Sequence, residues 1–85
     1  MQINPARLAV LHTRNARSLL AAGRRKRAIR KLKQARRAIA GLADPRFAVA
    51  SLWLRKALKN LKRFEDKRCQ RRCKAVIHLL SGPMT

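Results

Sequence analysis

Apolar residues recur at intervals of three and four along most of the chain, which is the spacing of one face of an α-helix. A first helix is expected over residues 5–22, with the inward positions Leu8, Leu11, Asn15, Leu19 and Ala22. A second is expected over residues 24–41, with the apolar positions Ala28, Leu32, Ala35, Ile39 and Leu42. The first half of the chain therefore predicts two amphipathic helices.

The apolar pattern is broader in the second half. After residue 45 the apolar positions are Phe47, Ala50, Leu54, Leu58 and Leu61, widened by Val49, Leu52 and Trp53. Acidic residues then interrupt the pattern, which resumes with Cys69, Cys73, Val76, Ile77 and Leu80 and ends at Ser81, Gly82 and Pro83. Because carboxylates favour the first turn of a helix, Glu65 and Asp66 predict a new helix there, although one bent helix also fits the pattern.

Two dipeptides of the same kind mark helix starts. Asn4-Pro5 and Asp44-Pro45 each place a side-chain acceptor at the N-cap and a proline at the first helical position. Gly23 and Gly41 stand where the first two helices are expected to end. The role expected for Asp44 is therefore structural.

The two halves of the chain resemble each other when the sequence is shifted by 41 positions. The shift aligns Leu11 with Leu52, Arg14 with Arg55, Ala16 with Ala57, Leu20 with Leu61, Lys33 with Lys74, and Gly41 with Gly82. Periods of this size are typical of stacked helical hairpins. The sequence therefore predicts a single all-α domain over residues 1–85, a small antiparallel bundle of three to four helices built from two hairpins.

Part of this pattern resembles the tetratricopeptide type of helical-hairpin repeat. The first helix and turn of that repeat are similar to Trp53, Leu54, Ala57, Leu61 and Phe64-Glu65-Asp66, and the rest of it to Ala16, Gly23, Ala28, Leu32 and Ala35. The chain departs from that family in its period, 41 residues against about 34, in His12 at the aromatic position, and in Cys69 and Cys73 at the small and large positions. The resemblance implies a protein-binding scaffold with a concave face.

Positive charge dominates the composition. The 85 residues include 23 Lys and Arg against 3 Asp and Glu, for a formal charge of +20. Ion pairs within helices cannot account for so many cations, and their self-repulsion opposes folding unless a partner neutralises it. The densest clusters are nine cations among the fourteen residues 24–37 and five within residues 67–74, namely Arg24, Arg25, Lys26, Arg27, Arg30, Lys31, Lys33, Arg36, Arg37, Lys67, Arg68, Arg71, Arg72 and Lys74.

These two clusters are the candidate nucleic-acid-binding residues. Phosphate contacts release counterions and need no reading of bases, and arginine suits bidentate phosphate binding. The composition is similar to that of small basic helical ribosomal and ribonucleoprotein proteins, which favours structured RNA over DNA. Trp53 is expected to pack in the core, since a platform for stacking bases usually offers more than one aromatic residue.

Two other partners remain open. A helical hairpin could dock on an acidic protein and regulate it, and a basic amphipathic surface could bind a membrane face, which the scarcity of aromatic residues disfavours. No apolar run approaches the length of about 18 residues that spans a bilayer. The small size and the three carboxylates argue against an enzyme.

The two cysteines are expected to be buried. Cys69 and Cys73 lie one helical turn apart and could bind zinc together with His78 and His12, but both fall on the apolar stripe of their helix. We therefore expect no metal and no cofactor. Two cysteines are too few for a disulfide framework, which predicts a reducing intracellular compartment, the cytoplasm or an organellar matrix.

Overall fold

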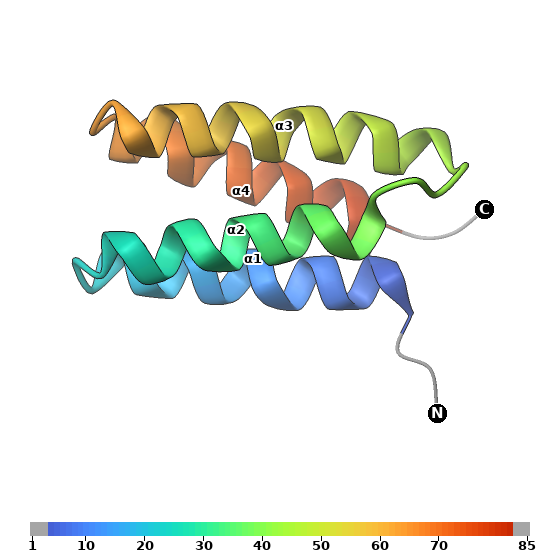
Figure 1. Ribbon diagram of the computed structural model, residues 1–85, viewed down its shortest axis with the longest axis horizontal. Helices are drawn as coiled ribbons and strands as arrows, with labels where there is room; N and C mark the ends of the chain where they lie inside the picture. Colours follow the sequence, from blue (N-terminus) through green and yellow to red (C-terminus); the bar gives the residue numbers. More distant parts are fainter. Residues whose placement is uncertain (1–3, 83–85) are drawn as a thin grey trace.

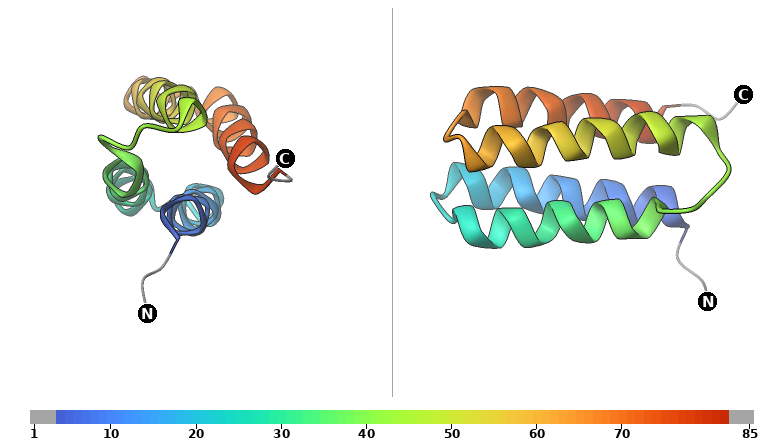
Figure 2. Two further views of the ribbon diagram at one scale, coloured as in Figure 1. Left: turned by 90° about the vertical axis from the view of Figure 1, so that its right-hand side faces the viewer. Right: turned by 45° about the horizontal axis from the view of Figure 1, so that its top comes forward.

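Four antiparallel helices make up the fold. The computed structural model describes residues 4–82, which form α1 (Pro5–Ala21), α2 (Arg25–Ile39), α3 (Pro45–Lys62) and α4 (Asp66–Ser81), with no strand in that range. The end-on view in Figure 2 shows the helices at the corners of a square, in the order α1, α2, α3, α4. The predicted all-α bundle of two hairpins is confirmed, with separate third and fourth helices. Pro83, expected to help end α4, lies outside the described residues.

Side-chain caps begin α1 and α3 as predicted. The side-chain oxygen of Asn4 accepts a hydrogen bond from the backbone N–H of Ala6 at 2.8 Å, and Oδ1 of Asp44 accepts one from Arg46, also at 2.8 Å. Each bond satisfies a backbone donor that has no partner inside the helix, and the proline that follows each cap already has a helical φ.

The two hairpin turns have the same backbone structure, 41 residues apart. In the first turn the N–H of Arg24 donates to the carbonyl of Leu19 at 2.8 Å, and Gly23 has φ +78°. In the second the N–H of Glu65 donates to the carbonyl of Asn60 at 2.8 Å, and Phe64 has φ +60°. Both are Schellman motifs, in which a left-handed residue ends the helix.

The core repeats with the same period. Eight of the nine buried positions in the first hairpin correspond to a buried position 41 residues later, in the pairs Ala9 and Ala50, Thr13 and Leu54, Ala16 and Ala57, Leu20 and Leu61, Ala28 and Cys69, Leu32 and Cys73, Ala35 and Val76, and Ile39 and Leu80. The two hairpins therefore pack face to face as near-equivalent units, α1 and α2 on one side and α3 and α4 on the other (Figure 1).

The buried face of α1 differs from the predicted one. Its buried residues are Ala6, Ala9, Thr13, Ala16 and Leu20, whereas Leu11 is 52% exposed and Ala22 is also exposed. Small side chains on the inner face let α1 approach its neighbours closely, so the bulkier Leu8 and Leu19 lie at the sides, half-buried. The Thr13 hydroxyl donates to the carbonyl of Ala9 at 2.7 Å, which allows a polar residue in this face.

The apolar face of α3 is narrower than its sequence indicates. Ala50, Leu54, Leu58 and Leu61 are buried, but Val49 is 40% and Leu52 48% exposed, and Leu42 before the helix is 43% exposed. Since α3 packs mainly against α2 and α4, its outer side has no helix to pack against. The expected widening of the buried face is therefore wrong for Val49 and Leu52, whereas Trp53 packs against the core half-buried.

Two leucines of α1 test this face assignment. Leu20→Ala should lower the free energy of unfolding by about 2–5 kcal/mol, because it leaves a cavity between helices, whereas Leu11→Ala should change it by less than about 0.5 kcal/mol. Urea denaturation followed by circular dichroism measures both. Equal losses in the two variants would contradict the assignment.

Candidate nucleic-acid interface

The two predicted cationic clusters lie on helices at opposite corners of the bundle. Arg24 directly precedes α2, residues 25–37 lie on α2, and residues 67–74 lie on α4 (Figure 2). The structure therefore does not combine the clusters into one continuous face. Only their first residues come together, because both helices begin at the same end of the molecule (Figure 1).

Cations gather around that end, where both hairpin turns lie. We call the cationic residues of the two turns and the adjoining helix ends the basic pole: Arg24, Arg25, Lys26, Arg27, Lys59, Lys62, Arg63, Lys67 and Arg68. All except the half-buried Arg25 are exposed. The three residues from the end of α3 were not among the predicted site residues, and antiparallel packing is what places them beside the predicted ones.

The opposite end of the bundle carries fewer cations. Arg7, Arg36, Arg37 and Arg46 lie there, and Arg46 bonds to Asp44 with an N–O distance of 2.9 Å. Of the other predicted residues, Arg30 and Lys33 are exposed on α2, Lys31 is half-buried, and Arg71 and Lys74 are exposed on the middle of α4. The basic pole therefore carries more cations than the opposite end, and the remaining cations lie along the middle of the helices.

All three carboxylates of the chain are engaged by arginine. Asp66 binds Arg25 at 2.6 Å, Asp44 binds Arg46, and Glu65 lies 3.3 Å from Arg68. Hydrogen bonds to Arg46 hold the pKa of the Asp44 carboxyl below its usual value. Among residues 4–82 the other lysines and arginines therefore have no carboxylate to neutralise them.

Arg25 joins the two hairpins at the basic pole. Its two terminal nitrogens donate to the two carboxylate oxygens of Asp66 at 2.6 and 3.1 Å, and one of them also reaches the carbonyl of Leu61 at 3.3 Å. Arg25 and Asp66 are themselves equivalent positions of the 41-residue repeat. A bidentate pair of this kind fixes orientation as well as charge, so the two turns are held side by side.

Phe64 projects at the tip of the second turn. Its side chain is 75% exposed, and the guanidinium carbon of Arg25 lies 4.5 Å from the ring centroid. A left-handed backbone costs a non-glycine residue about 1–2 kcal/mol, whereas an exposed cation–π contact returns about 0.5–1 kcal/mol. Folding stability alone therefore favours glycine here, as at the equivalent Gly23. The alignment of Phe64 with Gly23 is the sequence signal that points to this residue.

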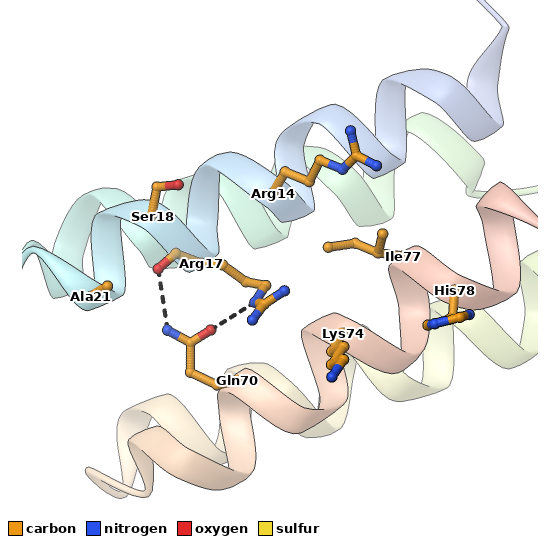
Figure 3. Close-up of a pocket in the computed structure, with 8 residues that line it drawn as sticks. All are labelled: Arg14, Arg17, Ser18, Ala21, Gln70, Lys74, Ile77 and His78. Atoms are coloured by element: carbon orange, nitrogen blue, oxygen red, sulfur yellow. Dashed lines mark hydrogen bonds between the residues drawn. The ribbon is translucent and has the colours of Figure 1, made fainter.

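A polar groove separates α1 from α4. Arg17 and Gln70 bridge it: Nε of Arg17 donates to Oε1 of Gln70 at 3.0 Å, and the Gln70 amide donates to the Arg17 carbonyl at 3.2 Å (Figure 3). Arg14 from α1 and Lys74 from α4 also line the groove. Of these four residues, only Lys74 belongs to the predicted set.

A second groove, between α3 and α4, exposes part of the single tryptophan. Trp53 packs against the core but is only half-buried, so the expectation that it lies in the core is met in part. Arg68, Arg71 and Arg72 line the groove beside it, and Nε of Arg72 donates to Asn60 at 3.2 Å. This groove begins at the basic pole and runs along α4.

Both cysteines are buried in the core, each 1% exposed. Hydrogen bonding to Cys69 and burial raise the pKa of the Cys73 thiol, which keeps it protonated at neutral pH. Within residues 4–82 no three histidine, cysteine or acidic side chains are grouped so that they could hold a metal ion. The two thiols therefore act as small core residues.

No protein-family model matches the chain, and neither a curated protein nor a solved structure matches it significantly. The resemblance to tetratricopeptide-type repeats stays a prediction. No helix in the described part of the chain combines the length and apolar character needed to cross a membrane.

Thiol labelling tests the burial of Cys69 and Cys73. We expect the native protein to react with a thiol reagent at pH 8 on the order of 100-fold more slowly than the urea-unfolded chain, because the thiols become accessible only on opening of the bundle. The absorbance change with time gives both rates. Similar rates in the two states would show that this face of α4 is open to solvent.

Protonation of His12 should destabilise the fold. Partial burial and, to a smaller extent, the charge of Lys31 lower its pKa below the usual 6.5, and within the described chain its buried Nδ1 has no hydrogen-bond partner. The unfolded chain therefore takes up the proton first as the pH falls. The contribution of His12 to stability is complete above about pH 6.5 and is lost as the pH falls through its lowered pKa.

Denaturation midpoints measured from pH 7.5 to 5 test this effect. The wild-type midpoint should fall across the range, and His12→Gln should remove most of that fall. The Asp44 carboxyl, whose pKa is lowered, titrates below this window. A slope that is unchanged in His12→Gln would assign the pH dependence to another group.

Proposed function

We propose that the protein is a noncatalytic nucleic-acid-binding module that grips phosphates with its basic pole. The observation that carries this proposal is the concentration of exposed cations around the two hairpin turns, while every carboxylate of the chain is already bound by an arginine. Unneutralised cations at this density attract polyanions, and each phosphate contact gains free energy by releasing counterions.

Structured RNA is the favoured ligand. The cations of the pole come from two turns and three helix ends around one end of the bundle, and do not form a straight track along one helix. Such a cap suits a site where phosphates of several strands converge, as at RNA loops and junctions. The outer side of α2 is almost wholly cationic, which favours backbone contacts over reading of base edges.

Catalysis has little support from the side chains at the pole. Asp66 and Glu65 are the acidic groups there, and each is held by an arginine. General acid–base catalysis by a pair of carboxylates needs groups free to exchange protons with a substrate. The cations of the pole therefore support a binding role and not a catalytic one.

Matched double variants test the proposal. Arg24→Gln with Arg27→Gln removes two exposed charges from the pole, and Arg7→Gln with Arg55→Gln removes two exposed charges from outside the pole and outside both predicted clusters. The probe is a labelled RNA hairpin with an internal loop, titrated by fluorescence anisotropy at several salt concentrations. The pole variant should bind about 10-fold more weakly and reduce the salt slope by up to about two, whereas the control should lose less than about 2-fold.

Two further ligands make the outcome decisive. The affinity for duplex DNA of equal charge is compared with the affinity for RNA. The affinity for polyglutamate, which represents an acidic protein surface, is measured in the same way. Equal losses in the two double variants would contradict the assignment to the pole. Binding of polyglutamate as tightly as RNA would instead favour the acidic-protein alternative.

A further inference from the structure

We infer that Phe64 is a stacking platform for an unpaired nucleobase, so that the ligand of the basic pole is RNA with exposed bases and not a regular duplex. This inference rests on the proposed function and adds to it the kind of RNA recognised. Its starting point is a solvent-exposed aromatic ring in a turn flanked by exposed cations.

The fold itself does not require a phenylalanine at this position. The ring is 75% exposed and lies outside the buried core. The equivalent turn of the first hairpin makes the same backbone hydrogen bonds with Gly23. Arg25 is already oriented by the two oxygens of Asp66 and by the Leu61 carbonyl, so the ring is not needed to hold it.

One side of the ring is covered and the rest is available. The Arg25 guanidinium lies over the ring at 4.5 Å from its centroid, and the large exposed area of the side chain leaves the opposite face open to solvent. A base stacked on that face would complete a column of guanidinium, phenyl ring and nucleobase, in which Arg25 takes the place of the second aromatic side chain that such platforms usually offer. Stacking on an aromatic side chain accepts any base, because every base presents a π-face.

The surrounding charges fit the backbone of a strand that presents such a base. Lys62 and Arg63 precede Phe64, and Lys67 and Arg68 follow it on the next helix, all of them exposed. These cations therefore flank Phe64 in the sequence on both sides. A nucleotide stacked on the ring has a phosphate on either side, and these phosphates need neutralising. In a regular duplex the bases are paired and stacked on one another, which leaves no base face for Phe64.

Three substitutions at this position separate stacking from simpler roles. Phe64→Leu keeps a large apolar side chain but removes the π-face, Phe64→Trp keeps the π-face, and Phe64→Gly removes the side chain at a position where φ is positive. Phe64→Gly should keep the fold, as judged by its circular dichroism spectrum and denaturation midpoint. Leu52→Ala, at an exposed apolar position on α3, is the control.

The probes are two RNAs that differ in one nucleotide: a blunt duplex, and the same duplex with a single bulged 2-aminopurine. Phe64→Leu and Phe64→Gly should bind the bulged RNA about 10-fold more weakly and abolish the stacking-induced change in 2-aminopurine fluorescence. Phe64→Trp and Leu52→Ala should retain both, and binding of the blunt duplex should change less than about 2-fold in every variant.

The outcomes distinguish this inference from the proposed function. Wild-type protein that binds neither RNA at moderate salt would overturn both. Wild-type binding that Phe64→Leu leaves intact would overturn the stacking role alone and indicate an apolar contact, such as one with a protein partner. Equal weakening on both RNAs would assign Phe64 to the general shape of the pole and also overturn the inference.

Discussion

Close packing of small side chains is the constraint on which the rest of the structure depends. The inner faces are rich in alanine, with Ala9, Ala28, Ala35, Ala50 and Ala57 fully buried, and the two cysteines continue this pattern on α4. Alanine removes little apolar area from water, so these positions stabilise the fold by letting the helices approach closely, and the larger buried side chains of Leu32, Leu54 and Leu61 then fill the space between them. That contact must outweigh the mutual repulsion of a chain with a charge of +20, which makes ionic strength a determinant of folding as well as of binding.

The same constraint decides where the charges lie. A seam of small residues has no room for long side chains, so lysine and arginine occupy the outer sides and ends of the helices. Arg17 and Arg25 are partly buried, and each has a polar partner, Gln70 and Asp66 respectively. The paired arginines thus hold helices together, whereas the cations of the basic pole other than Arg25 and Arg68 have no carboxylate partner.

Local patterns predicted the fold well because its strongest signals are local. The caps at Asn4 and Asp44, the stripe of α2 and the 41-residue period need no knowledge of distant contacts. The inner face of α1 was missed because Ala6, Ala9 and Thr13 are weakly hydrophobic beside Leu11, and only packing against α2 and α4 selects the smaller set.

The basic pole combines residues from both hairpins, and its composition follows from which helix ends meet in space. The left-handed backbone of Phe64 follows from its place in a turn. It was not predicted, because phenylalanine rarely adopts a positive φ.

The start of α1 and the end of α4 lie at the same end of the bundle, which would allow the order of the two hairpins to be changed. Asn4 at the start of α1 and Gly82 after α4 line the same groove, on the side of the molecule where residues 40–44 connect α2 to α3 (Figure 1). A short linker between Asn4 and Gly82 would therefore mirror the connection that residues 40–44 make between α2 and α3. With that linker in place and the chain opened at Gly41, the order of the hairpins would be reversed without moving a helix.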